Sequence, residues 1–243
     1  MIFDFSITHE VILVWIAAAV TMILMIATAR VISANLATTG KFGNLMESLV
    51  DFVRSNIVDE FLGHHGKAWF GFFATLFFFI LSNNLLGKLP IPGFHSPTGN
   101  INVTCALAVT VFLVCQVVGI VKLGPVGYFK RKFLLPGAPV ILQILMIPIM
   151  VLVLLAEPFS LMVRLFANMT AGHLVLLTFA SAQMVGGVWL LNHPNYLAKT
   201  AAILPFALSV ILVAFELFVA FIQAFIFTLL SALYLSESLE EHH

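Results

Sequence analysis

The sequence predicts an all-α integral membrane protein with five transmembrane helices and one amphipathic helix at the membrane surface. Of its 243 residues, 61% are hydrophobic and only 9% are charged. Five apolar blocks reach the length of ~20 residues that a membrane-spanning helix needs. A soluble core does not require such runs, so we expect a single membrane domain over residues 1–243.

The first three spans are predicted at 11–29, 68–87 and 101–121. Asp4 and Glu10 precede the first run without any Lys or Arg, so we interpret it as a retained helix and not as a signal peptide. Between the first two spans, residues 42–62 place apolar and charged side chains on opposite faces at helical spacing. This pattern is typical of an interfacial helix, whose apolar face meets either lipid or a partner subunit.

The last two spans, 138–191 and 201–235, are longer than a bilayer requires. As a single helix, 201–235 would measure ~52 Å against ~30 Å of hydrocarbon. Pro148 and Pro158 can bend the preceding span where neighbouring protein covers the freed backbone groups. We therefore expect a long, bent fourth helix and a long, steeply tilted fifth helix.

Basic residues in the loops predict the orientation. Eight fall on one side of the predicted spans, and the opposite side has only Lys88 and Lys199; the eight are Arg30, Lys41, Arg54, Lys67, Lys122, Lys130, Arg131 and Lys132. The positive-inside rule places the amino terminus outside and the carboxyl terminus in the cytoplasm. We expect a multi-pass protein of a bacterial inner membrane, since no transit peptide is recognisable. The formal net charge is zero and no basic stripe occurs, so no nucleic-acid partner is expected.

Ionisable residues inside the last two spans are the main functional signal. Arg164 is the only Lys or Arg between Phe133 and Leu197. An arginine at the bilayer centre costs ~2.5 to ~17 kcal/mol and cannot escape by losing its proton, so it indicates function. The residues predicted to form the polar pathway are Glu157, Arg164, Asn168 and His173 in the fourth span, with Glu216 and Gln223 in the fifth.

Helical spacing groups these residues into two sets. Asn168 shares a face with Arg164, and Gln223 lies within ~20° of the face of Glu216. The simplest pairing puts Gln223 beside Arg164 and Asn168, and Glu216 beside His173. A histidine and a carboxylate can relay protons, whereas a permanent cation can hold an approaching carboxylate in its ionised form.

No phosphate-binding loop, nucleophile constellation or metal motif occurs, so we expect no cofactor, no metal and no catalysis by this chain alone. The histidine pairs at 64–65 and 242–243 lack other ligands at suitable spacing. An ion-coupled secondary transporter is the alternative function, but it would usually carry paired repeats, which we do not find. A purely structural subunit would have little use for a polar pathway across the bilayer.

The polar motifs resemble subunit a of F-type ATP synthases. They are Arg164-Leu165-Phe166-Ala167-Asn168-Met169, Ala171-Gly172-His173, Phe215-Glu216, Ile222-Gln223-Ala224-Phe225 and Tyr234-Leu235. The resemblance implies that the last two helices lie against a rotating ring of c subunits, each with one carboxylate. It implies that Arg164 strips the proton from each arriving carboxylate and blocks leakage between two offset aqueous half-channels. The implied partners are the c-ring, the peripheral-stalk b subunits, the rest of the synthase and the lipid bilayer.

Glu157 is a departure from that family's pattern. Family members often carry a carboxylate two helical repeats before the arginine, where this chain has Met150. Glu157 lies one repeat before Arg164 on nearly the same face, so it supplies either an exit-side carboxylate or a structural salt bridge to Arg164.

The expected ion is H+. His95 in the loop 88–100 either lines the channel mouth or belongs to a turn.

Overall fold

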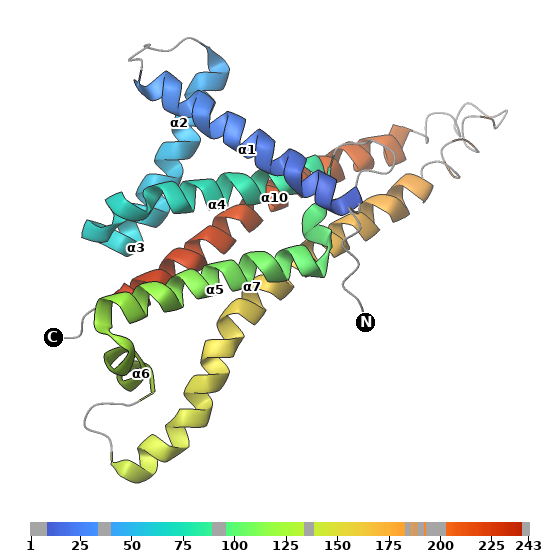
Figure 1. The fold of residues 1–243 in the computed structure, drawn as a ribbon. Coiled ribbons are helices and arrows are strands. Elements are labelled where there is room, and N and C mark those ends of the chain that lie inside the picture. Colours follow the sequence, from blue (N-terminus) through green and yellow to red (C-terminus); the bar gives the residue numbers. More distant parts are fainter. Residues whose placement is uncertain are drawn as a thin grey trace.

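The computed structural model describes residues 9–33, 40–88, 96–133, 139–182, 186, 188, 192 and 203–239. All regular structure in these residues is helical (Figure 1). The α-helices are α1 (His9–Ser33), α2 (Lys41–Val53), α3 (Glu60–Leu62), α4 (Gly66–Leu86), α5 (Ile101–Leu123), α6 (Pro125–Phe133), α7 (Val140–Ala182) and α10 (Ile203–Leu239). Short helical turns join some of them: η1 (Arg54–Asp59, a π-helix), η2 (Gly63–His65) and η3 (Pro97–Gly99).

Four helical stretches among the described residues are long and apolar enough to cross a membrane. They are Gly43–Leu86, Ile101–Leu123, Ile141–Phe179 and Ala207–Leu239, and Val11–Ile26 is a shorter apolar helix. These lengths confirm the prediction of an all-α integral membrane protein. The predicted count of five spans, and the boundaries given to each, stay predictions.

The predicted interfacial segment 42–62 folds as α2, η1 and α3. Its apolar residues Val53, Ile57 and Val58 are buried, whereas its charged residues are exposed. The ring of Phe52 lies 5.6 Å and 5.2 Å, between centroids, from two aromatic rings of α10, Phe221 and Phe225. The apolar face of this segment therefore packs partly against the chain's own helices, a neighbour that the sequence pattern does not reveal.

The core lies between α4, α5, the second half of α10 and one stripe of α7. Phe73, Phe77 and Phe78 of α4 are buried with Phe227 of α10, and Leu165 contributes from α7. Large aromatic side chains bury much area each and so dominate such contacts. This packed region holds α7 and α10 in place and leaves their other faces uncovered.

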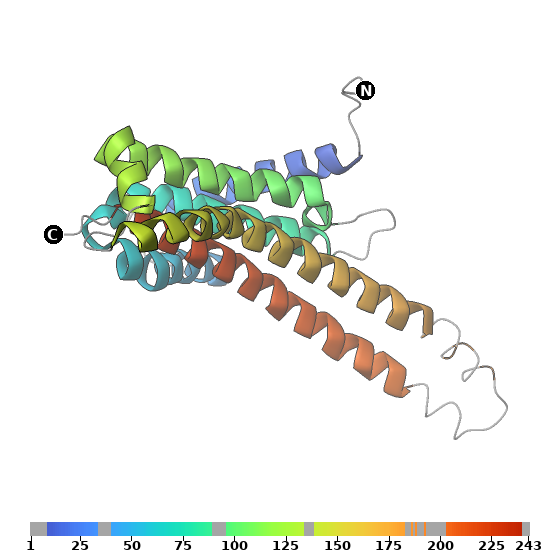
Figure 2. The ribbon, with the colours of Figure 1, turned by 90° about the horizontal axis from the view of Figure 1, so that it is seen from below.

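The two longest helices, α7 and α10, have 43 and 37 residues, which correspond to ~65 Å and ~56 Å. Figure 1 shows that α7 is bent, with its first half diverging from α5. Pro148 and Pro158 lie inside α7, and each removes a backbone donor and clashes with the preceding turn. Figure 2 shows the second half of α7 and the first half of α10 side by side, extending beyond the other helices.

Basic residues and the carboxyl end of α10 meet at one end of the bundle, next to α6 (Figures 1 and 2). Lys122 Nζ donates to the carbonyl oxygen of Leu239 at 2.7 Å, and Arg131 donates to that of Glu237 at 3.1 Å. Lys88 follows the carboxyl end of α4 at the opposite end. Lys88 thus lies at the end opposite these basic residues, Lys199 lies outside the described residues, and the predicted orientation stays a prediction.

Candidate functional site

Arg164 lies in the interior of α7 with its side chain exposed. The next residue, Leu165, is fully buried, whereas Ala167 and Ala171 are exposed on the following turns. One stripe of α7, with Leu161, Leu165 and Met169, is buried, and the guanidinium lies beside small residues on an exposed face of the helix. Within the described residues Arg164 has no ion-pair partner, because Glu157 and Glu216 pair with other cations.

Glu216 is buried in a stretch of α10 that is otherwise open. Between residues 207 and 219 it is the only buried side chain, while Phe215 and Phe218 are about 60% exposed. Its Oε2 lies 2.9 Å from Lys88 Nζ, and the two side chains are 8% and 6% exposed. A charge at such a depth requires a partner, and the ammonium of Lys88 provides one.

Gly172 of α7 lies against this ion pair. A Cβ atom at this position would stand 2.8 Å from Lys88 Nζ and 3.5 Å from Glu216 Oε1. The backbone of α7 thus forms one wall of the pair's site. Because Gly172 precedes His173, the carboxylate of α10 lies against the turn of α7 that carries the histidine, and the predicted pairing of Glu216 with His173 stays a prediction.

His173 is partly exposed and accepts a hydrogen bond from the backbone N–H of Ser96 at 3.2 Å through Nε2. The Ser96 hydroxyl is 2.7 Å from that of Thr98, which donates to Asn84 Oδ1 at 2.9 Å. Asn84 in turn donates to the carbonyl oxygen of Ala220 on α10 at 3.3 Å. The segment before α5 therefore connects α7 and α10 by polar contacts. We call Lys88, Ser96, His173 and Glu216 the Glu216 cluster.

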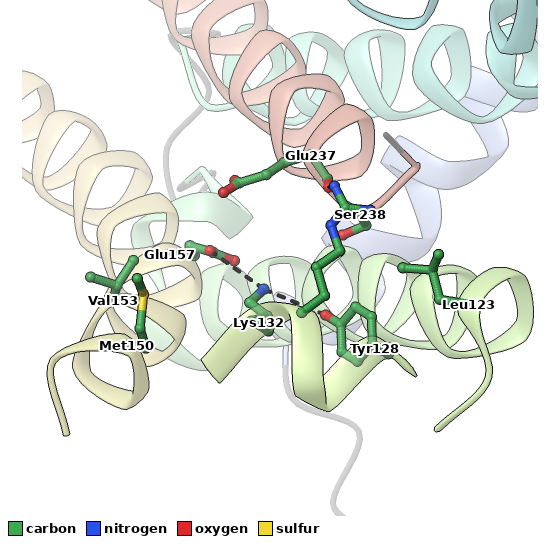
Figure 3. A pocket seen from close by; sticks show the side chains of 9 residues that line it. Leu123, Tyr128, Lys132, Met150, Val153, Glu157, Glu237 and Ser238 are labelled. Atoms are coloured by element: carbon green, nitrogen blue, oxygen red, sulfur yellow. Dashed lines mark hydrogen bonds and ion pairs between the residues drawn. The ribbon is translucent and has the colours of Figure 1, made fainter. Parts of the chain in front are cut away.

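Glu157 belongs to a second cluster nearer the end that holds α6. Its Oε1 lies 3.8 Å from Lys132 Nζ, with side chains 12% and 21% exposed. The two residues line a cavity of about 340 Å³, as Figure 3 shows, and Met150 lines the same cavity. Lys132 also donates to the Tyr128 hydroxyl at 3.4 Å. We call Glu157, Lys132 and Tyr128 the Glu157 cluster.

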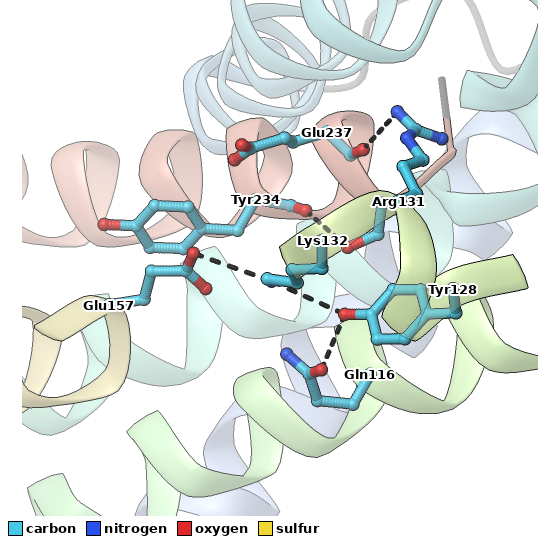
Figure 4. Close-up of polar contacts among 8 residues, drawn as sticks. Gln116, Tyr128, Arg131, Lys132, Glu157, Tyr234 and Glu237 are labelled. Carbon is cyan, nitrogen blue, oxygen red and sulfur yellow. Dashed lines mark hydrogen bonds and ion pairs between the residues drawn. The ribbon is translucent and has the colours of Figure 1, made fainter. Parts of the chain in front are cut away.

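Further polar contacts fix the wall of this cavity (Figure 4). The Tyr128 hydroxyl donates to Gln116 Oε1 of α5 at 2.6 Å. Arg131 holds the backbone of α10 at Glu237, whose side chain also faces the cavity region. A space of this size holds several water molecules and has polar groups to bind them. The structure therefore gives Glu157 an ion-pair partner other than Arg164, together with a route to solvent.

Asn168 and Gln223 make no hydrogen bond to Arg164 among the described residues. Gln223 is 5% exposed and its Nε2 has no partner there, while Asn168 is half-buried. Buried amides normally find a hydrogen-bond partner, so the donor of Gln223 is an exception within the described part of the chain. The predicted pairing of these two amides with the guanidinium stays a prediction.

Sequence reasoning missed Lys88 and the buried hydroxyls of Ser96 and Thr98. Lys88 was counted only as a loop charge that helps to set the orientation. One signal was available, because Lys88 is one of two basic residues on the side that the positive-inside rule leaves poor in charge. His95, at the start of the same segment, lies outside the described residues.

The fold and the two clusters define a class: a polytopic helical membrane protein with ionisable groups inside its two longest helices. The sequence matches the family model described as "ATP synthase A chain" over residues 11–236, and the chain belongs to this family. This confirms the resemblance that the motifs around Arg164 indicated.

Relatives from several bacteria agree. The chain is 39% identical over 236 residues to "ATP synthase subunit a 2" of Chlorobaculum tepidum, which covers 96% of this chain and 63% of the relative. It is 39% identical over 241 residues to "ATP synthase subunit a" of Myxococcus xanthus, covering 99% and 75%. The protein of the same name from Magnetococcus marinus is 37% identical, with 98% and 86% covered. The chain thus spans less than two thirds of the length of the Chlorobaculum protein.

Proposed function

We propose that the chain is the proton-translocating stator subunit of a rotary F-type ATP synthase. It does no catalysis itself, and couples ion flow to rotation of a c-subunit ring and hence to ATP synthesis elsewhere in the complex. The observation that carries this proposal is the place of Arg164. Among the residues that the structure describes it has no ion-pair partner, and along α7 it stands between two sites at which a carboxylate has its own cation.

The spacing along α7 supports two offset half-channels. Glu157 precedes Arg164 by seven residues, or ~10 Å of helix, and Gly172, which touches the Glu216 site, follows it by eight residues, or ~12 Å. The two clusters therefore lie on opposite sides of the arginine along the helix. Each connects with a different end of the bundle, the Glu157 cluster with α6 and the Glu216 cluster with the end of α4.

A proton follows this order during synthesis. It enters through His173 and Glu216 and protonates a carboxylate of the c-ring, which then rotates away through the lipid. After almost a full turn the carboxylate meets Arg164, whose fixed charge favours the ionised form, so the proton leaves through the cavity beside Glu157. Arg164 also prevents a direct leak, because a fixed cation in low dielectric repels a proton that would pass between the half-channels.

The uncovered faces of α7 and α10 fit this arrangement. Phe159 of α7 and Val210 and Phe218 of α10 are each more than half exposed. The c-ring covers the face around Arg164, with both helices steeply tilted, and lipid and peripheral-stalk b subunits cover other faces. The amino terminus is extracytoplasmic, and the basic end with the carboxyl terminus is cytoplasmic, in a cell membrane.

The test is proton pumping by the assembled complex carrying Arg164→Ala. ATP-driven pumping is expected to be lost while the passive proton leak through the membrane sector rises. Arg54→Ala is the matched control, because Arg54 is an exposed arginine whose contact with Asp59 spans 3.8 Å. Coupled pumping that survives in Arg164→Ala at the rate of the control would show that the arginine is structural and would refute the proposal.

A further inference from the structure

We propose that Lys88 is a further residue of the proton path, a tethered counter-cation that keeps Glu216 available as a proton acceptor. Gly172 of α7 has no side chain and so leaves space for the ammonium group of Lys88. This inference rests on the proposed function, in which Glu216 passes protons towards the c-ring. It adds to that function a fixed positive charge on the inlet side, which is carried by a side chain of this protein.

The first argument is burial. A lone carboxylate in low dielectric neutralises itself by binding a proton, and would then hold that proton instead of passing it on. Glu216 is 8% exposed and has Lys88 Nζ at 2.9 Å. Lys88, from the end of α4, pairs with it, and on α7 the titratable His173 follows Gly172, whose added Cβ would lie 3.5 Å from Glu216 Oε1. Its own helix contributes the neutral Gln223 two turns further on.

Two glycines, at positions 172 and 87, leave space near the ammonium group and the backbone of Lys88. At Gly172 a Cβ would stand 2.8 Å from Lys88 Nζ, so the flexible end of the lysine side chain would have to shift. At Gly87, immediately before the lysine, a Cβ would overlap with that of Ser96. The close approach of Gly87 to Ser96 therefore positions the backbone of Lys88. The absence of a side chain at Gly172 leaves the space that the Lys88 ammonium group occupies.

The charge of Lys88 affects both the uptake and the release of a proton by Glu216. A proton from water, passed through His173, forms an O–H bond on Glu216, while Lys88 keeps all three of its protons and its charge. The site then carries one net positive charge instead of none. That charge favours release of the proton from Glu216 to the ionised carboxylate of the ring, which restores the ion pair. Lys88 is therefore a positioning residue that acts through Glu216.

The test is passive proton flux through the assembled membrane sector, driven by a fixed membrane potential and measured from pH 6 to 9. For Lys88→Met we expect flux per assembled complex to fall on the order of tenfold at pH 7 and the profile to move to higher pH by about one unit. The reason is that the ionised form of a buried carboxylate is disfavoured when no counter-charge lies beside it. Lys88→Arg keeps the charge and is expected to keep most of the flux and the pH profile.

Gly172→Ala provides a second variant that leaves the lysine in place. Its methyl group would displace the ammonium, so the pH profile is expected to shift in the same direction as in Lys88→Met. Gly71→Ala is the matched control, a glycine inside α4 whose Cβ would meet nothing within 4 Å, and it should leave the profile unchanged. Where Lys88→Met fails to assemble, the comparison of Gly172→Ala with Gly71→Ala decides.

Two results separate this inference from the proposed function. If Glu216→Gln abolishes flux while Lys88→Met and Gly172→Ala keep the normal flux and pH profile, the role of Lys88 is refuted and the channel stands. If Glu216→Gln itself conducts normally, the inlet assignment of the proposed function fails, and the role of Lys88 fails with it. Flux and profile changes in both Lys88→Met and Gly172→Ala, with Lys88→Arg near normal, support the inference.

Discussion

The Glu216 and Glu157 clusters are both carboxylate–lysine pairs, yet they differ in depth and closeness. Glu216 and Lys88 are 2.9 Å apart and almost wholly buried, whereas Glu157 and Lys132 are 3.8 Å apart, partly exposed and beside a cavity of about 340 Å³. A buried ion pair exchanges protons only with protein groups in contact with it. An ion pair beside a cavity that holds several water molecules exchanges protons with solvent. Under the proposed function, an inlet at the Glu216 cluster would therefore depend on specific relay groups and an outlet at the Glu157 cluster mainly on water.

The largest expected effect comes from removing the buried carboxylate. Glu216→Gln keeps the shape but cannot accept a proton, so proton-driven ATP synthesis is expected to fall on the order of 100-fold or more, as for loss of a general acid–base group. Synthesis by the complex in vesicles under an imposed proton gradient measures this. Glu47→Gln, an exposed carboxylate of α2, serves as control. Equal rates of ATP synthesis in Glu216→Gln and Glu47→Gln would show that the buried carboxylate has no role in proton transfer.

A smaller loss is expected at the open cluster. In Glu157→Gln, water in the cavity can still carry the proton away, so synthesis should drop by no more than about tenfold, equivalent to ~1.4 kcal/mol. The same vesicle assay gives the rate. Unaltered synthesis would remove Glu157 from the channel and leave its pair with Lys132 as a structural contact.

The two lysines should differ in their contribution to stability. Loss of one partner from a buried pair costs ~3 to ~5 kcal/mol, because the other charge stays behind unpaired. A pair 3.8 Å apart with a partly exposed partner contributes up to ~1 kcal/mol. Thermal unfolding of the purified complex should therefore show a clearly lower midpoint for Lys88→Met than for Lys132→Met. The reverse order would mean that the depth of the two pairs is misjudged.

The smallest effect is expected at a lysine that caps the end of a helix. Lys122 donates to the carbonyl oxygen of Leu239 in the last turn of α10, a contact that favours the helix end by ~0.3 to ~1 kcal/mol. Lys122→Met should raise hydrogen exchange in the last turns of α10 and leave proton flux unchanged. A change of flux as large as that of Glu157→Gln would show that this end of α10 takes part in the outlet.

Much of the fold could be predicted because hydrophobic run length and helical period are local properties. The unusual length of the last two helices and the bend of the proline-containing α7 (Figure 1) follow from residue spacing, whereas the predicted pairing of Glu216 with His173 stays a prediction. The family could be recognised for a similar reason, because the motif around Arg164 is contiguous in the sequence.

The partner of each carboxylate could not be predicted, because it comes from a distant segment. Glu216 meets a lysine 128 positions earlier in the chain, and only the turn after α4 brings that lysine close. Glu157 meets Lys132 of α6 instead of Arg164, which shares its helix face. The apolar face of α2 is a similar case, since the packing of Phe52 against α10 depends on the fold and not on the period of α2.

The most direct test of the central claim, that Arg164 separates two paths open to opposite sides, is the accessibility of single cysteines to a membrane-impermeant thiol reagent. The variants carry one cysteine at Val153, which lines the Glu157 cavity, or at Ser96, in a chain whose native Cys105 and Cys115 are replaced by alanine. We predict that the cysteine at Val153 reacts only from the cytoplasmic side and the one at Ser96 only from the opposite side. Reaction of either cysteine equally from both sides, or of both from the same side, would contradict the account.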